Sequence, residues 1–214
     1  MEHNHLIEIL SDQALHEDIS LAKALNRPLA EIWQTINKLQ NYGIHIELIK
    51  KQSIILKEPL IMLDSDRIKQ QLHTPNLDLT IKEKLASTNQ TIKEMPDFGS
   101  KKLVCLSEMQ TSGQGRMQRP WHSPFAQNIY LTLAYPFQGN IKDLSGLSLV
   151  VGLAVVTALN SFFDSKHELK LKWPNDIFVE DKKLAGILIE TTTKSSYCYN
   201  VIIGIGINVN MLSD

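Results

Sequence analysis

The sequence predicts a soluble α+β protein made of two domains, residues 1–63 and residues 64–214. Short helical patterns dominate the first part, whereas after Pro75 strand-like patterns outnumber helical ones and are joined by tight turns. Hydrophobic residues make up 43% of the 214 residues and charged residues 21%, which is enough to bury a core. The formal net charge of −1 excludes a molecule-wide attraction to nucleic acid or to anionic membranes.

Residues 1–63 are expected to form three helices followed by a small hairpin. The apolar positions of the three helices are Leu6, Ile7 and Leu10, then residues 19–25, and then Leu29, Ile32, Ile36 and Leu39. The last set is spaced by three and four residues, which is typical of one helix face. Residues 44–48 then alternate between apolar and polar, and residues 54–56 supply a second strand. This order is the outline of a winged helix-turn-helix.

DNA binding by this first domain has an alternative, a packing or dimerisation module without a nucleic-acid partner. Residues 1–64 hold six Lys/Arg and nine Asp/Glu, a net charge of −3, whereas DNA affinity depends on cations that meet phosphates. The third helix also begins with apolar groups and Glu31, where residues that contact bases are expected. The candidate DNA contacts are Gln34, Thr35 and Lys38 on the helix and Lys50 and Lys51 on the wing.

In the second domain the sequence predicts a polar helix over residues 65–72 and a mixed or antiparallel sheet. The expected strands are residues 103–110, 128–135, 169–173, 177–179, 184–191 and 197–211, with a hairpin turn at residues 181–183. Residues 144–163 carry no charge over a length that would cross a membrane. Because small and polar residues dilute this stretch, we expect a central helix packed on both sides and no membrane contact.

The two cysteines, Cys105 and Cys198, each lie in an apolar strand-like run. They are too few and too far apart for a disulfide framework or a metal knuckle. Two buried, reduced thiols are expected, and the polar amino terminus does not resemble a signal peptide.

A polar loop at residues 111–121 is the first segment that could take part in ligand binding or catalysis. Gly113 and Gly115 allow the backbone to turn sharply and to approach a ligand closely, and Arg116 and Arg119 offer forked donors for phosphate or carboxylate oxygens. The loop lacks the Gly-Lys-Ser/Thr of a P-loop. Taken alone it is more often a mobile surface loop than an anion site.

Three further segments have both a chemical and a structural interpretation. Lys170 and Lys172 face the same side of a strand that ends in Trp173-Pro174-Asn175-Asp176, which suits charge neutralisation but also suits an ordinary surface turn. Ser87-Thr88-Asn89 is compatible with a simple helix N-cap. Gly204-Ile205-Gly206-Ile207-Asn208 is compatible with a core strand that contains glycine.

The order of these segments resembles the biotin–protein ligase family, in particular its bifunctional ligase/repressors. The matching motifs are Ser87-Thr88-Asn89, Gln110 with Gly113-Gln114-Gly115-Arg116, Arg119-Pro120-Trp121, Ser123-Pro124-Phe125, Lys172-Trp173-Pro174-Asn175-Asp176, Lys183-Leu184-Ala185-Gly186 and Gly204-Ile205-Gly206-Ile207-Asn208. Each motif is weak alone, whereas their joint order over residues 87–211 is specific. The resemblance implies a mixed-sheet catalytic domain like that of class II synthetases, in a cytoplasmic protein.

The resemblance also implies roles for individual residues. Residues expected to bind biotin are Ser87, Thr88, Asn89, Gln110 and Gly186. Residues expected at the adenylate and its phosphates are Gln114, Gly115, Arg116, Arg119, Trp121, Asn175 and Asn208. Lys172 is expected between the biotin carboxylate and the α-phosphate and, with Arg116, is the predicted catalytic residue, so that Lys172→Ala would nearly abolish biotin-dependent ATP–pyrophosphate exchange.

The implied reaction adenylates biotin with ATP and Mg²⁺ to give biotinyl-5'-AMP. The biotinyl group then passes to a lysine of the biotin carboxyl carrier protein domain of acetyl-CoA carboxylase. Positioned cations are needed because carboxylate and triphosphate repel and the transition state spreads negative charge over phosphate oxygens. Operator DNA and a second copy of the chain are the further partners that the resemblance implies, and no protein metal site is expected.

The sequence departs from the family pattern in two places. Gln114, Met117 and Gln118 stand where the best-known bacterial members place more arginine and glycine, which predicts weaker phosphate contacts. The chain ends at Asp214, so we expect an incomplete catalytic domain without the family's small C-terminal barrel. Two alternatives are a lipoate or octanoyl transferase and a non-enzymatic, biotin-sensing DNA-binding protein.

Overall fold

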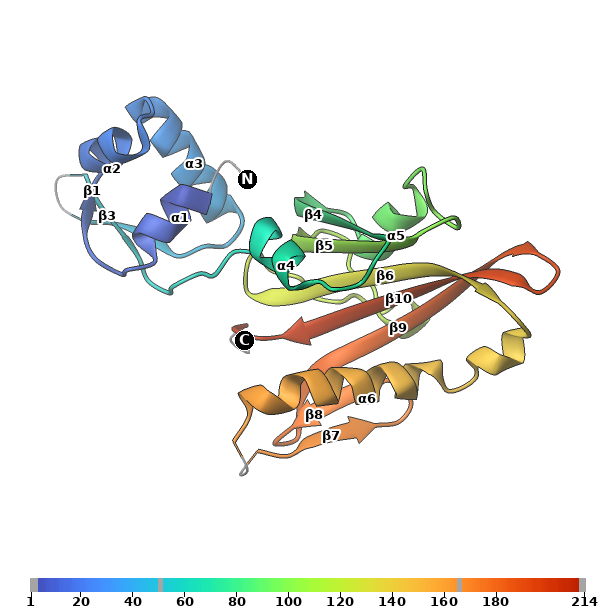
Figure 1. Cartoon of the computed structure of the whole chain (residues 1–214). Coiled ribbons are helices and arrows are strands. Elements are labelled where there is room, and N and C mark those ends of the chain that lie inside the picture. Colours follow the sequence, from blue (N-terminus) through green and yellow to red (C-terminus); the bar gives the residue numbers. More distant parts are fainter. Residues whose placement is uncertain (1–3, 50–51, 165–166, 212–214) are drawn as a thin grey trace. The chain divides into compact units, whose positions relative to one another are not determined.

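The computed structural model describes residues 4–49, 52–164 and 167–211 (Figure 1). The chain divides into two compact units. The first comprises residues 1–63 together with residues 124–126, and the second comprises residues 64–123 and 127–214. Each unit has its own sheet and its own buried apolar residues, and each is described by itself below.

The first unit consists of three helices and a three-stranded antiparallel sheet of order β1-β3-β2. Its elements are α1 (Asn4–Leu10), β1 (His16–Glu17), α2 (Asp18–Leu25), α3 (Leu29–Asn41), β2 (Ile46–Ile49) and β3 (Ser53–Leu56). The helices lie where the apolar spacing predicts them, and Leu10, Ile36 and Leu39 are fully buried. The short strand β1 was not predicted, because two residues carry no periodicity that a sequence pattern can reveal.

The second unit is built on a seven-stranded mixed sheet of order β4-β5-β6-β10-β9-β8-β7. Its elements are α4 (Ser65–Gln71), β4 (Leu77–Leu85), α5 (Thr88–Lys93), β5 (Lys102–Gln110), β6 (Asn128–Gln138), α6 (Leu147–Leu159), β7 (Leu169–Lys172), β8 (Asp176–Val179), β9 (Lys182–Ser195) and β10 (Cys198–Asn208), with short 3-10 helices η1 (Arg116–Gln118), η2 (Ile141–Leu144) and η3 (Asn160–Phe162). Among the strands that the structure describes, β4 and β5 are the one pair that runs in parallel. The predicted α+β class with a mixed sheet is therefore confirmed, although β4 itself was missed.

Two helices cover opposite faces of this sheet, as the alternation of side chains along β10 shows. Ile202 packs with Ile92 of α5, whereas Val201 and Ile203 face the residues that α6 covers. In Figure 1, α5 lies beside β4–β6 and α6 runs along β7–β9. One face of β10 is therefore left to α5 and to the pocket described below.

The expectation that residues 144–163 form a helix packed on both sides is wrong. In α6 only Gly152 is buried, and the outward side chains of Val150 and Leu153 are 65% and 63% exposed. Residues 141–162 are long and apolar enough by composition to cross a membrane. However, the 13 residues of α6 span only about 20 Å, less than the roughly 30 Å of a hydrocarbon core. The inner face packs on the sheet through Val155 and Val156.

Two smaller expectations also need correction. The hairpin between β8 and β9 turns at Glu180 and Asp181, which have positive φ angles of 47° and 62°, so Lys182 and Lys183 lie in the strand rather than in the turn. Cys105 is buried and free as expected, and its burial raises the pKa of its thiol to about 11. Cys198 is also free but only partly buried.

Candidate active site

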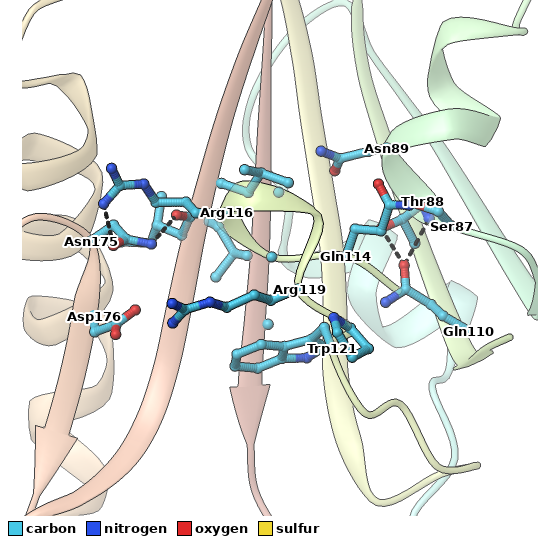
Figure 2. Close-up of a pocket in the computed structure, with 18 of the residues that line it drawn as sticks. Ser87, Thr88, Asn89, Gln110, Gln114, Arg116, Arg119, Trp121, Asn175 and Asp176 are labelled. Carbon is cyan, nitrogen blue, oxygen red and sulfur yellow. Dashed lines mark hydrogen bonds between the residues drawn. The ribbon is translucent and has the colours of Figure 1, made fainter. Parts of the chain in front are cut away.

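A cavity of about 480 Å³ lies on the α5 face of the second unit's sheet. It is lined by strands β9 and β10, by the start of α5 and by the loop at residues 111–121 (Figure 2). Its residues are Ser87, Thr88, Asn89, Gln110, Gln114, Gly115, Arg116, Met117, Arg119, Pro120, Trp121, Leu131, Pro174, Asn175, Asp176, Lys183, Gly186, Ile187, Leu188, Gly204, Ile205 and Gly206. This size is within the range of small-molecule sites.

Glycines on two neighbouring strands form the floor of this cavity. Gly186 of β9 and Gly206 of β10 are register partners, and the indole of Trp121 lies over both. A Cβ atom at Gly206 would lie 2.5 Å from Cε2 of Trp121, and one at Gly204 would lie 2.5 Å from Oδ1 of Asn89. Because real Cβ atoms do not approach that closely, only glycine allows these two side chains to lie flat on the sheet.

The loop at residues 111–121 folds back on itself over the cavity. Gly115 N donates to Arg119 O at 2.8 Å, and Trp121 N donates to Gly113 O at 2.8 Å. At its tip Met117 and Gln118 have φ angles of 55° and 57°, which non-glycine residues adopt only at a cost of about 1–2 kcal/mol each. The loop is therefore a defined turn in this conformation, with the side chain of Met117 84% exposed.

One end of the cavity is polar and uncharged. Gln110 Oε1 accepts from the backbone N–H of Thr88 at 2.8 Å and lies 3.0 Å from the Thr88 hydroxyl. Gln110 Nε2 donates to Ser123 Oγ at 3.1 Å, which fixes the orientation of the carboxamide. Thr88 and Asn89 are both buried. This end offers directed donors and acceptors to an uncharged polar group.

The other end of the cavity is cationic. In Figure 2 the side chains of Arg116 and Arg119 extend toward Asn175 and Asp176, away from Thr88 and Gln110. Arg116 Nη1 donates to Asn175 Oδ1 at 3.2 Å. Asn175 is itself held by β9, because its Nδ2 donates to Ile187 O at 2.8 Å. The loop is thereby tied to the strand opposite it.

A third cation, Lys183, completes this end. Its Nζ lies 2.9 Å from Asp176 Oδ1 and 5.1 Å from the centroid of the Trp121 ring. Asp176 Oδ1 has no partner with hydrogen-bond geometry, so the contact is an ion pair rather than a directed bond. Trp121 Nε1 is likewise a buried donor without a hydrogen-bond partner among the described residues. Buried donors of this kind are usually satisfied by a ligand or by water.

Most residues that the resemblance assigned to biotin and adenylate are brought together here. The predicted residues that line the cavity are Ser87, Thr88, Asn89, Gln110, Gly186, Gln114, Gly115, Arg116, Arg119, Trp121 and Asn175. Lys172 and Asn208 are outside it. The Nζ atom of Lys172 lies 4.8 Å from the centroid of the Phe178 ring, and Asn208 Nδ2 donates to Lys183 O at 3.0 Å.

Sequence reasoning missed Lys183 and Asp176 as pocket residues, although both stand in quoted motifs. Lys183 was missed because Lys182 and Lys183 were placed in the hairpin turn. In a regular strand Lys183 and Gly186, three residues apart, would face opposite sides, and the register shift in the β8–β9 pairing at Ile177/Phe178 offsets this. Moving the turn to Glu180 and Asp181 puts Lys183 on β9, from which it reaches the cavity.

The candidate DNA contacts in the first unit divide into three groups. Gln34 is exposed on α3, and Lys38 lies partly buried with its Nζ 5.6 Å from the centroid of the Tyr42 ring. Thr35 is buried and its hydroxyl donates to Glu31 O at 2.9 Å, so little of its side chain is accessible to DNA. Lys50 and Lys51 lie outside the described residues.

Comparison with known proteins gives concordant matches. The model of the Biotin/lipoate A/B protein ligase family matches residues 82–208. The bifunctional ligase/repressor BirA of Salmonella typhimurium is 34% identical over 206 residues, which are 96% of this chain and 63% of that protein. Biotin--[acetyl-CoA-carboxylase] ligase of Paracoccus denitrificans is 36% identical over 58% of this chain and 51% of its own length.

A solved structure agrees with these relatives. The biotin protein ligase of Aquifex aeolicus in complex with biotin and ATP aligns with a TM-score of 0.51 and 33% identity, covering 64% of this chain and 54% of its own. The alignment thus shows that this chain shares the fold of a biotin protein ligase. The chain belongs to the Biotin/lipoate A/B protein ligase family, and it spans somewhat less than two thirds of the length of the BirA relative.

Proposed function

We propose that this chain binds biotin in the cavity, activates it with ATP to biotinyl-5'-AMP and transfers it to a lysine of a biotin carboxyl carrier protein. The observation that supports this proposal best is the polarity of the cavity, which is uncharged at Thr88 and Gln110 and cationic at Arg116, Arg119 and Lys183. Biotin has an uncharged ureido ring at one end and a carboxylate at the other. The relatives named as biotin ligases favour the same substrate.

In the activation step, a carboxylate oxygen of biotin attacks the α-phosphorus of ATP and pyrophosphate leaves. Arg116, Arg119 and Lys183 would hold the two anions together and stabilise the charge that builds on the phosphate oxygens. In the transfer step, the amine of the acceptor lysine attacks the biotinyl carbonyl and AMP leaves. The loop at residues 111–121 would shield the mixed anhydride from water in between.

Mg²⁺ is proposed as a companion of ATP rather than as a resident metal. Among the described residues, no group of three or more His, Cys, Asp or Glu side chains is placed to hold a metal ion. Asp176 is the carboxylate that lines the cationic end, and Lys183 occupies it. Mg²⁺ commonly binds through substrate phosphates with one or two carboxylates, so the residues present fit a metal that arrives on the nucleotide.

The direct experiment is calorimetric titration of the 214-residue chain with biotin and, separately, with lipoic acid. Binding of biotin with no heat from lipoic acid is expected, and acceptor biotinylation with ATP and Mg²⁺ then tests the second half of the reaction. Binding of lipoic acid alone would replace this proposal with a lipoate ligase or an octanoyl transferase. Biotin binding without adenylation would favour the non-enzymatic sensor.

We further propose that residues 1–63 form a winged helix-turn-helix domain that contacts operator DNA and that residues 64–214 form the catalytic domain. The favouring observation is the order of three helices and a hairpin, with α2 and α3 joined through Asn26, which has a φ of 50°. The repressor function named for the BirA relative fits this order. A gel shift with operator-length DNA, with and without biotin and ATP, tests it, and the absence of any shift would leave a packing module.

A further inference from the structure

Behind the uncharged end of the cavity, Lys93, Glu190 and Thr132 form a hydrogen-bonded chain with Asn89 and Thr88. The first three do not line the cavity, whereas Asn89 and Thr88 do. Glu190 of β9 accepts from Asn89 Nδ2 at 2.6 Å through one oxygen and from Lys93 Nζ at 2.9 Å through the other. Asn89 and Lys93 are four residues apart on α5, so they share a helix face. Thr132 of β6, fully buried, lies on the other side of Asn89.

Thr132 connects Asn89 to Thr88. Its hydroxyl oxygen lies 2.6 Å from Asn89 Oδ1 and 2.7 Å from the hydroxyl oxygen of Thr88. The close approach is possible because Thr132 is paired with Gly204, whose missing side chain leaves room for the Asn89 carboxamide. The chain of contacts therefore runs from Lys93 through Glu190, Asn89 and Thr132 to Thr88.

The donors and acceptors along this chain have one consistent direction. A carboxylate only accepts, so Asn89 must turn its Nδ2 toward Glu190 and its Oδ1 toward Thr132. A hydroxyl has one proton, so Thr132 uses its proton on Asn89. At the contact between the two hydroxyls, Thr88 is then the donor.

This direction changes what Thr88 and Gln110 present to a ligand. With its proton directed at Thr132, the Thr88 hydroxyl keeps its lone pairs for the cavity. Gln110 Oε1 then receives only the backbone N–H of Thr88 and also keeps acceptor capacity. The opposite direction would direct the Thr88 proton at Gln110 Oε1 and the Thr132 proton at Thr88, which uses up acceptors at both positions.

We infer that Glu190, held by Lys93 and acting through Asn89 and Thr132, is a positioning residue that makes this end of the cavity an acceptor for ligand N–H groups. This inference rests on the proposed function, in which the ligand head is the ureido ring of biotin with its two N–H donors. Glu190 and Thr132 do not touch the ligand themselves. Through Thr88 and Gln110, Glu190 and Thr132 favour ligands whose N–H groups donate hydrogen bonds over ligands of similar shape that lack these donors.

The substitution Glu190→Gln reverses the direction of the chain. Lys93 only donates, so it holds the oxygen of the new amide and leaves the NH₂ group facing Asn89. Asn89 must then flip, Thr132 must donate to Thr88, and Thr88 must donate to Gln110. Thr132→Val removes the relay hydroxyl at nearly constant volume, and Thr132→Ser keeps it.

The test is calorimetric titration of the full 214-residue chain with biotin and with biotin methylated on a ureido nitrogen. The unsubstituted chain should prefer biotin by at least about tenfold, since one N–H bond is lost on methylation. In Glu190→Gln and Thr132→Val, biotin should bind about ten- to a hundredfold more weakly, with the preference reduced to about threefold or less. Thr132→Ser should retain the preference. Glu94→Gln is the matched control, because Glu94 is an exposed carboxylate of the same region whose partner is Gln90.

The outcomes separate the inference from the proposed function. If the unsubstituted chain binds biotin but both variants weaken biotin and its methylated analogue equally, Glu190 and Thr132 are only structural and the inference fails. If Glu190→Gln does not fold, the comparison of Thr132→Val with Thr132→Ser decides in the same way. If the unsubstituted chain does not bind biotin, the proposed function is wrong and the inference fails with it.

Discussion

The position of the pocket cations gives the sharpest prediction about the reaction. Family resemblance assigned the central charge to Lys172, whereas the structure places Lys183 in the cavity and Lys172 outside it. We therefore expect Lys183→Ala to damage activation far more than Lys172→Ala. Each variant removes one lysine charge, from β7 in Lys172→Ala and from β9 in Lys183→Ala. The comparison therefore tests whether the position of the charge inside or outside the cavity determines its effect.

The magnitudes follow from the surroundings of each lysine. Lys183 is 39% exposed and lies between Asp176 and the Trp121 ring, so its charge acts in a partly desolvated cavity. Loss of one such stabilising group costs about 2.7–4 kcal/mol in the transition state, or roughly a hundred- to a thousandfold in kcat. Lys172 is exposed and contacts the Phe178 ring outside the cavity, so its charge is screened by solvent. Its removal should therefore reduce the rate by less than about tenfold.

The assay is biotin-dependent exchange of labelled pyrophosphate into ATP, measured at saturating biotin. Lys182→Ala is the matched control, because Lys182 is the exposed neighbour on β9 and is absent from the cavity lining. Circular dichroism and thermal unfolding confirm that each variant is folded. Near-normal exchange in folded Lys183→Ala, or an equal loss in Lys172→Ala, would refute the reasoning from cavity position.

Two further predictions concern stability and thiol chemistry. Asp18 is 1% exposed and accepts from Trp33 Nε1 at 3.0 Å, so Asp18→Ala should lower the free energy of unfolding of the first unit by about 1–3 kcal/mol. Urea unfolding followed by tryptophan fluorescence, in a Trp121→Phe and Trp173→Phe background that leaves Trp33 as the reporter, measures this loss; no change would show that the indole finds another partner. Burial raises the pKa of Cys105 from 9.0 to about 11, so at pH 8 its thiolate fraction is about a hundredfold below that of an ordinary cysteine, and a thiol reagent should label Cys198 first. Because the unfolded chain releases this proton near pH 9 and the native chain holds it, the stability linked to Cys105 is present below pH 9 and is lost as the pH rises toward 11. Equal labelling of both cysteines at pH 8 would contradict this account.

The fold was largely predictable because long apolar patterns report burial directly. The stripe of Ile32, Ile36 and Leu39 marked one helix, and the runs that became β5 and β10 marked the central strands. The prediction failed for β4 and α6. In β4, Leu77, Leu79 and Ile81 alternate with polar residues, and this signal was overlooked; as an edge strand, β4 has no fully buried side chain. In α6 apolar residues surround the whole helix, so composition alone does not reveal that one side is exposed.

The candidate site was predictable as a set of motifs but not as a geometry. Thr88, Gln110 and Arg116 were each identified by resemblance, and the fold brings them to one cavity. What the sequence did not reveal is which lysine reaches the cavity, because the side on which Lys183 lies depends on the register shift between β8 and β9, which no residue pattern marks. The relay through Thr132 and Glu190 was also hidden, since it joins strands that are far apart in sequence.

The glycine floor of the cavity has a consequence for redesign. Because Gly186 and Gly206 have no side chain, no substitution at either position can make the cavity deeper. Any larger residue there would displace Trp121. Substitution on these two glycines can therefore only reduce the accessible volume, whereas shortening side chains elsewhere in the lining, such as those of the loop at residues 111–121, can enlarge it. A variant library for bulkier biotin analogues is best directed at exposed Met117 and its neighbours, and the two strands should be left unchanged.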